Sequence, residues 1–137
     1  MILKLILSDL YRYTGNQKLS SLVKNYFFNR GFNFCVWLRI ASSKTWFAKI
    51  AYPVFYYKKK KYGIDIHANT KIGFGLYIGH GGPLVVSPTA TIGNNVTIGA
   101  GSVVTKDIPE NATAAGNYAK VLNFDQPGKF VNKRYKI

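Results

Sequence analysis

Apolar residues follow two different spacings along the chain, and the change between them lies near residue 62. In the first part they recur three and four positions apart, as at Leu19, Leu22 and Val23. This spacing places side chains on one face of a helix, so the first part is predicted to be helical. From Ile66 onward the aliphatic residues recur every six positions instead.

A few residues predict where these helices begin and end. Ser8 is a candidate N-cap, and Gly15 and Gly31 are candidate stops, because glycine readily adopts the left-handed conformation that ends many helices. Pro53 lies inside the last apolar run of this part and is predicted to bend or break its helix, because proline has no N–H to donate.

The six-residue period is informative because neither a helix nor a simple strand has it. A glycine follows the aliphatic residue in four of the units, where a tight corner is expected. One step, from Ile78 to Val86, contains eight residues instead of six, and the two extra residues are predicted to bulge outward and present His80 at the surface. The aliphatic positions of the period are Ile66, Ile72 and Ile78, followed by Val86, Ile92, Ile98 and Val104.

A fixed period of this length predicts a solenoid of short strands and corners, with three sides to each coil. We therefore expect an α+β protein in which a basic, aromatic helical segment at 1–62 precedes a β-helix at 63–122 and a basic tail at 123–137. Such a short stack leaves open ends and exposed edges, so we also expect self-association.

Composition and charge narrow the class of protein. Hydrophobic residues make up 47% of the chain, which excludes a disordered protein. Residues 1–62 contain 12 Lys and Arg and one acid, whereas residues 63–137 contain 7 and 4. The single cysteine, Cys35, permits no internal disulfide, and no Cys and His cluster suggests a metal, so we expect a cytoplasmic protein without a metal site.

The segment from Thr45 to Lys61 has two interpretations. Aromatic residues followed by four lysines are typical of a segment at an anionic membrane surface, which predicts peripheral contact with the inner face of the membrane. The alternative is that the aromatic residues form a helical core or a subunit contact, and the lysines a solvated edge. The sequence has no nucleic-acid-binding motif, and nucleic acid is not an expected partner.

From Lys61 to Leu122 the chain reads "KYGIDIHANTKIGFGLYIGHGGPLVVSPTATIGNNVTIGAGSVVTKDIPENATAAGNYAKVL" and resembles the serine acetyltransferase family of hexapeptide-repeat acyltransferases. It is most similar to the short members associated with capsular or exopolysaccharide biosynthesis, and "DLYRYTG" is similar to them as well. The resemblance implies a left-handed parallel β-helix, here of about two to three coils. It also implies a homotrimer and acetyl-CoA as acyl donor.

In that family an aspartate–histidine pair carries out the chemistry, and the matching residues here are Asp65 and His80. The six-residue count makes these two residues neighbours across one coil. His80 is expected to act as general base on an acceptor hydroxyl, and Asp65 to orient its imidazole. The backbone N–H groups of Gly81 and Gly82 are candidates for stabilising the oxyanion. His67 is expected to be a surface or corner residue.

The resemblance also implies where CoA binds, namely along the last coils and the segment after them. Small residues there allow the pantetheine arm to approach the backbone, and lysines can meet the nucleotide phosphates. The matching residues are Ala100, Gly101 and Gly116, with Lys120 and Lys106 as the candidate phosphate ligands.

The chain departs from the family in length, because whole units are missing between about Gly93 and Gly99. Three functions stay open at this point. The first is O-acetyl transfer to a hydroxyl of a sugar or glycan precursor. The second is serine acetyl transfer in cysteine biosynthesis. The third is a catalytically impaired oligomeric scaffold.

Overall fold

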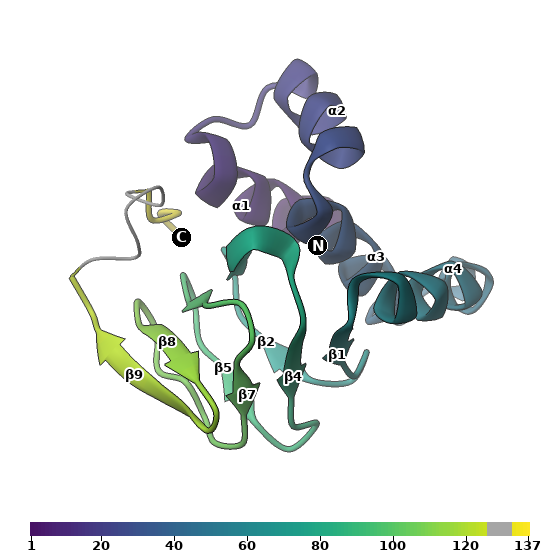
Figure 1. The fold of residues 1–137 in the computed structure, drawn as a ribbon. Coiled ribbons are helices and arrows are strands. Elements are labelled where there is room, and N and C mark those ends of the chain that lie inside the picture. The colour runs from purple at the N-terminus through teal and green to yellow at the C-terminus, as the bar shows by residue number, and fades with distance from the viewer. Residues whose placement is uncertain (126–132) are drawn as a thin grey trace.

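The computed structural model of the protein describes residues 1–125 and 133–137, so part of the predicted tail at 123–137 lies outside the described residues. Helices fill the chain up to residue 62, and short strands follow in a coiled stack (Figure 1). The helices are α1 (Ile2–Thr14), α2 (Leu19–Phe28), α3 (Arg30–Ala41) and α4 (Trp46–Tyr62).

The predicted N-cap at Ser8 was wrong, because α1 begins six residues earlier. The apolar residues from Ile2 to Leu7 continue the helix, and inside it the Ser8 hydroxyl donates to the carbonyl of Leu5. The predicted stop at Gly15 is confirmed, since this residue ends α1 in the left-handed conformation.

The predicted stop at Gly31 was also wrong. Gly31 lies inside α3, because Asn29 ends α2 and then caps α3 by accepting a hydrogen bond from the N–H of Phe32. Helix α4 runs through Pro53, so the break allowed at this residue does not occur, and the bend stays a prediction. Pro53 is exposed, whereas Phe55 anchors the helix in the core, so water can satisfy the carbonyl that proline leaves free.

The strands form three parallel sheets, one for each side of the coil (Figure 1). The first sheet has the order β1-β4-β7, the second β2-β5 and the third β3-β6-β8, to which β9 adds an antiparallel edge. The strands are β1 (Ile64–Ile66), β2 (Lys71–Ile72), β3 (Tyr77–Ile78), β4 (Leu84–Val86), β5 (Thr91–Ile92), β6 (Thr97–Ile98), β7 (Val103–Val104), β8 (Thr113–Gly116) and β9 (Ala119–Asn123).

Strand register explains the one irregular step in the six-residue period. Ile66 pairs with Val86, twenty positions further along, whereas Val86 pairs with Val104, eighteen positions further along. Eighteen residues correspond to three six-residue sides, so the first coil contains two extra residues. These residues lie between β3 and β4 and form the turn around His80.

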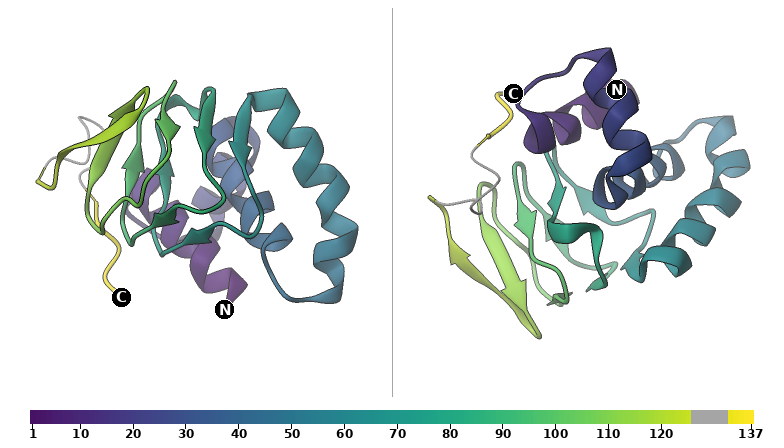
Figure 2. Two further views of the ribbon diagram at one scale, coloured as in Figure 1. Left: turned by 90° about the horizontal axis from the view of Figure 1, so that it is seen from below. Right: turned by 45° about the horizontal axis from the view of Figure 1, so that its top comes forward.

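The aliphatic residues of the period stack into one narrow core. Each of them is almost fully buried except Ile72, which is partly buried. Phe34, Leu38 and Phe55 from α3 and α4 join the same cluster and close the end of the stack next to β1. Both views in Figure 2 show α4 at this end, opposite β9. Cys35 is buried here as well, and burial raises the pKa of its thiol.

A buried ion pair joins the helices to the first coil. Asp9 of α1 accepts two hydrogen bonds of 2.8 Å from Arg39 of α3, and both side chains are buried. Arg39 also donates to the carbonyl oxygens of Ile72 and Gly73. Asp9 in turn accepts from the N–H of Leu76. The pair therefore provides partners for backbone groups of the β2–β3 corner that are shielded from water.

Two further residues of α1 bind the same corner. The Ser8 hydroxyl accepts a hydrogen bond of 3.0 Å from the N–H of Gly75. Arg12 donates to the carbonyl of Gly75 and to the hydroxyl of Thr97, both at 2.7 Å, and so connects two successive coils. Burial lowers the pKa of Arg12 to about 10, which leaves its guanidinium charged at neutral pH.

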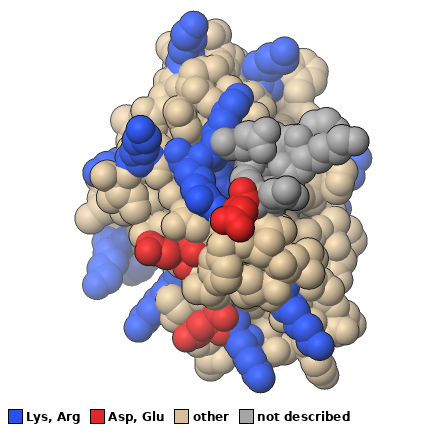
Figure 3. Space-filling model, turned by 90° about the vertical axis from the view of Figure 1, so that its left-hand side faces the viewer, with Lys and Arg blue, Asp and Glu red and all other residues tan. Residues whose placement is uncertain are grey.

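Charge is distributed unevenly over the molecule. Apart from Asp9 and Asp65, the acidic residues Asp107, Glu110 and Asp125 all belong to the last part of the chain. Figure 3 shows acidic side chains among lysine and arginine on the face where β9 lies. Within residues 1–125 and 133–137, no helix combines the length and the apolar character needed to cross a membrane.

We expect the loss of one partner of the Asp9–Arg39 pair to be strongly destabilising. Replacing Asp9 with Ala leaves Arg39 as an uncompensated buried charge, which lowers the free energy of unfolding by about 3–5 kcal/mol. Urea denaturation measures this change. The control is Lys24→Ala on the exposed side of α2, which changes stability by no more than about 0.5 kcal/mol. Equal stability of Asp9→Ala and the unaltered chain would contradict this role.

Candidate active site

His80 lies at the centre of a sharp turn, Gly79–Gly81, between β3 and β4. Its backbone has φ 57°, in the left-handed region that few residues other than glycine adopt. The side chain is exposed to solvent. The two extra residues of the first coil therefore present an imidazole at the surface of the stack.

Gly81 fixes this turn against the helices. It is buried and has φ 54°, and a Cβ placed on it would lie 2.6 Å from the backbone nitrogen of Gly31 in α3. Any larger side chain would force the turn and the start of α3 apart. The N-terminal helices thus determine the position of the residue next to His80.

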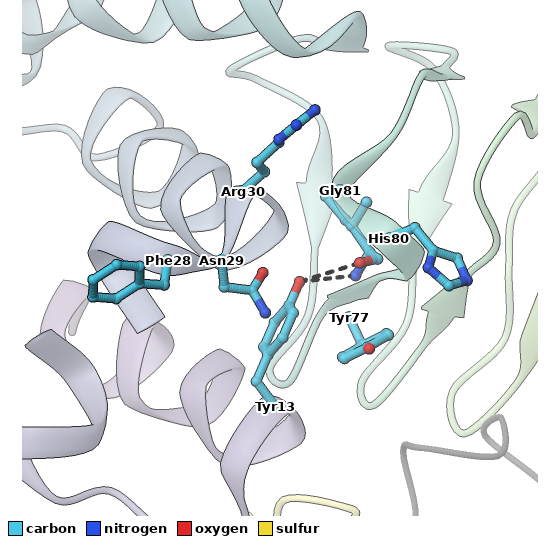
Figure 4. Close-up of a pocket in the computed structure, with 8 residues that line it drawn as sticks. Tyr13, Phe28, Asn29, Arg30, Tyr77, His80 and Gly81 are labelled. Carbon is cyan, nitrogen blue, oxygen red and sulfur yellow. Dashed lines mark hydrogen bonds between the residues drawn. The ribbon is translucent and has the colours of Figure 1, made fainter. Parts of the chain in front are cut away.

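A cavity of about 480 Å³ lies between the helices and the His80 turn. Figure 4 shows Tyr13 and Asn29 extending toward it from the helices, while the His80 ring is turned away from Tyr13 at the rim. The residues that line the cavity are Tyr13, Phe28, Asn29, Arg30, Tyr77, Ile78, His80 and Gly81. The sequence did not predict that the helices line this cavity, because their residues reach the His80 turn only through tertiary contacts.

Tyr13 holds the strand that leads into the turn. Its hydroxyl accepts from the N–H of Ile78 at 3.1 Å and donates to the carbonyl of the same residue at 3.5 Å (Figure 4). Burial raises the pKa of Tyr13, so the hydroxyl keeps its proton. The sequence signal for this contact is the segment "DLYRYTG", in which Asp9, Arg12 and Tyr13 all bind the first coil.

Asp65 lies on the outer side of β1, opposite Val85 of the next coil. Its carboxylate pairs with the ammonium group of Lys59 at 2.7 Å. It also borders a different cavity, formed with the end of α4. Among the described residues, Asp65 and His80 share neither a hydrogen bond nor a cavity, so the predicted pairing of the two side chains stays a prediction.

His67, the other histidine, lies at a corner of the first coil. Its Nδ1 accepts a hydrogen bond of 3.2 Å from the N–H of Asn69, two residues further along. This local contact stabilises a turn and places His67 at a different corner from His80.

The structure brings together several of the predicted backbone contact residues. A Cβ on Gly82 would lie 3.4 Å from the Cβ of Ala100 in the next coil. The N–H of Gly101 donates to the carbonyl of Pro83 at 2.6 Å. One coil further on, the N–H of Gly116 donates to the hydroxyl of Ser102 at 3.3 Å. Small residues thus run across three coils beside the His80 turn.

The two candidate phosphate ligands are exposed lysines in different places. Lys120 lies on β9 opposite Ala115, near the row of small residues. Lys106 follows β7 on another side of the coil. Neither lysine forms an ion pair with another residue of the described segments, so both are free to meet an anion.

Comparison with curated proteins identifies acetyltransferases. Over 68 residues the chain is 44% identical to the galactoside O-acetyltransferase of Escherichia coli. This matched segment covers 48% of this chain and 32% of that protein. Over 83 residues it is 40% identical to a putative acetyltransferase of Staphylococcus aureus, covering 57% of this chain and 39% of that protein. The chain therefore spans between 32% and 39% of the length of these relatives. No protein-family model matches it.

Comparison with solved structures identifies the fold. The serine acetyltransferase of Neisseria gonorrhoeae, crystallised with serine, has a TM-score of 0.58 at 22% identity over 87% of this chain and 68% of that one. A serine O-acetyltransferase of Brucella melitensis, described as a bacterial transferase hexapeptide repeat protein, has a TM-score of 0.51 at 22% identity over 88% of this chain and 66% of that one.

These comparisons confirm the predicted class, a helical N-terminal segment followed by a left-handed parallel β-helix. They also confirm the resemblance to the hexapeptide-repeat acetyltransferases, since the relatives in sequence are named as acetyltransferases and the neighbours in structure are serine acetyltransferases.

The packing of Gly81 can be tested with a matched pair of substitutions. Gly81→Ala and Gly101→Ala each place a side chain at a positive φ, which costs about 1–2 kcal/mol. No atom lies within 4 Å of a Cβ on Gly101, whereas a Cβ on Gly81 meets α3. We expect Gly81→Ala to be less stable than Gly101→Ala by a further ~1–3 kcal/mol in urea denaturation. Equal losses would show that the turn does not pack tightly on α3.

Proposed function

We propose that the protein transfers an acetyl group from acetyl-CoA to a hydroxyl group of a sugar or glycan precursor. The observation that carries this proposal is an exposed histidine, His80, on a glycine-flanked left-handed turn next to a cavity. The sugar class is favoured because the 44% identity is to a galactoside O-acetyltransferase. Serine is the alternative acceptor, on the resemblance to serine acetyltransferases.

His80 acts as the general base in this proposal. Its imidazole takes the proton of the acceptor hydroxyl while the oxygen attacks the thioester carbonyl of acetyl-CoA. The tetrahedral intermediate then collapses, the C–S bond breaks, and the CoA sulfur receives the proton from the imidazolium. The exposed position of His80 allows both substrates to reach the ring.

The small residues beside the turn are suited to hold the acyl donor. The backbone N–H groups of Gly81 and Gly82 lie next to His80 in the chain and can donate to the oxyanion. The row formed by Ala100, Gly101 and Gly116 leaves the backbone open to the pantetheine arm. Lys120 and Lys106 are the proposed ligands of the nucleotide phosphates, and their lack of ion-pair partners in the described segments supports this role.

Asp65 is proposed to be a positioning residue for His80. In the structure its carboxylate is held by Lys59 at 2.7 Å, so orienting the imidazole requires Asp65 to exchange this partner for His80. The ion pair with Lys59 is solvent-exposed on the carboxylate side and therefore contributes little energy. Such an exchange is thus energetically inexpensive.

Oligomerisation is part of the same proposal. We propose a homotrimer of β-helices of about two to three coils, because such a short stack has exposed sides that association would bury.

The role of His80 can be tested directly. We expect His80→Ala to lower kcat/KM by about 10²–10⁴-fold, the usual contribution of a general base, without loss of stability. Loss of thioester absorbance from acetyl-CoA, with sugar and serine acceptors in parallel, measures this change. His67→Ala is the matched control and keeps full activity. Equal activity of the two variants would contradict the assignment of His80. No turnover and no calorimetric binding of CoA by the unaltered chain would favour the scaffold function.

The pH profile of kcat/KM distinguishes a role of Asp65 in orienting His80 from a merely structural role. We expect Asp65→Asn to lower kcat, by up to about 10⁴-fold as for the orienting aspartate of a catalytic triad, and to alter the pH profile of kcat/KM. Lys59→Met releases the carboxylate and does not lower kcat. If Asp65→Asn retained both the rate and the pH profile, Asp65 would have no part in the reaction.

A further inference from the structure

Helix α4 exposes an unusual amount of apolar surface. Ala48, Ala51 and Phe55 face the core, so a single stripe of the helix is buried. The opposite stripe contains Trp46 and Ile50, which are 73% and 66% exposed. The other exposed large apolar residues of the helix are Phe47, Tyr52, Val54, Tyr56 and Tyr57. Contiguous exposed apolar surface of this kind marks an interaction site.

This finding contradicts the helical core that was one form of the alternative interpretation of the segment from Thr45 to Lys61, whereas a subunit contact stays open. The aromatic residues do not form a helical core, because most of them lie on the outside of α4. Trp46, Ile50 and Tyr57 are separated by four and seven positions and therefore share one face of the helix. The charges around this face indicate which partner covers it.

The charges around the face favour an anionic partner. Helix α4 contains five lysines and no acidic residue. Lys60 and Lys61 lie over the rings of Tyr56 and Tyr57 at 4.9 and 5.8 Å, so cationic and aromatic groups alternate along the exposed side. The same face of a second copy is a poor occupant, because its α4 would bring five more lysines and no acidic residue to the contact.

Apolar residues are also exposed at the start of the chain. Met1 and Leu3 are 92% and 62% exposed. Both line a cavity of about 650 Å³ together with Lys44 and Thr45, the residues that lead into α4. The start of α1 thus borders one cavity with the segment that precedes α4.

We propose that the exposed face of α4 binds the surface of an anionic lipid bilayer. The helix lies parallel to the membrane, with Trp46 and Ile50 inserted between the head groups and Lys60 and Lys61 paired with lipid phosphates. Trp and Tyr are the residues that prefer the boundary between lipid and water, and Lys side chains extend along apolar surface to reach the phosphates. Binding uses the folded helix and does not require a membrane-spanning segment.

Sedimentation with lipid vesicles tests the proposal. The unaltered protein is expected to sediment with vesicles of equal parts phosphatidylcholine and phosphatidylglycerol, and not with phosphatidylcholine alone. Lys60→Ser with Lys61→Ser is expected to weaken binding about 25-fold, since each lysine contributes about fivefold. Trp46→Ser with Ile50→Ser is expected to weaken it at least tenfold, roughly the loss of one or more inserted apolar side chains. These four residues are exposed, so the variants fold, which circular dichroism verifies.

A charge-matched control separates the α4 surface from general attraction of a basic protein to anionic lipid. Lys71→Ser with Lys136→Ser also removes two exposed lysines, but from the β-helix and the C-terminal segment. We expect this variant to retain most of its binding. Equal losses in the two lysine variants would overturn the assignment to α4, as would failure of the unaltered protein to sediment.

Tryptophan fluorescence supplies a second readout. The chain has two tryptophans, of which Trp46 is exposed and Trp37 is partly buried. Emission is expected to shift to the blue on addition of anionic vesicles, and Trp46→Phe is expected to retain binding but lose the shift. If instead Trp46→Ser with Ile50→Ser changed the oligomeric state in sedimentation velocity and left vesicle binding intact, the face would be a subunit contact and the proposal would be wrong.

Discussion

The buried ion pair between Asp9 and Arg39 is the interaction on which the arrangement of the two parts depends. The carboxylate and the guanidinium compensate each other's charge. They also supply hydrogen-bond partners for the N–H of Leu76 and the carbonyls of Ile72 and Gly73. At this corner Gly73 and Phe74 form backbone hydrogen bonds with the next coil, and the helices supply partners for further backbone groups. The helices therefore complete the hydrogen bonding of the first coil as well as covering its end.

The same docking determines where the candidate site lies. Tyr13 is one helical turn beyond Asp9, and its hydroxyl fixes Ile78, the last residue before the turn that carries His80. The start of α3 contacts the same turn through Gly31 and Gly81. Loss of helix docking is thus expected to disturb His80 even though no helical residue performs the proposed proton transfer.

Much of the fold could be predicted from the sequence, because the six-residue period repeats and each repeat carries an isoleucine or a valine at the same position. The eight-residue step likewise predicted the turn at His80, and strand register confirms the two extra residues. The helix boundaries at Ser8 and Gly31 were predicted wrongly, because the apolar residues before Ser8 extend α1 and because Asn29 both ends α2 and caps α3. The contact between Lys59 and Asp65, six residues apart, and the contribution of the distant Asn29 to the His80 cavity carry no periodic signal.

The helical part also reverses the usual distribution of polar and apolar side chains. Asp9, Arg12 and Arg39 are buried against the β-helix, while Trp46 and Ile50 are exposed. Burying charges is costly unless they are paired, and here the polar backbone of a β-helix corner supplies the partners. Helix α4 instead docks through a narrow apolar stripe of Ala48, Ala51 and Phe55. Its other aromatic side chains and its lysines therefore form an apolar and cationic exterior.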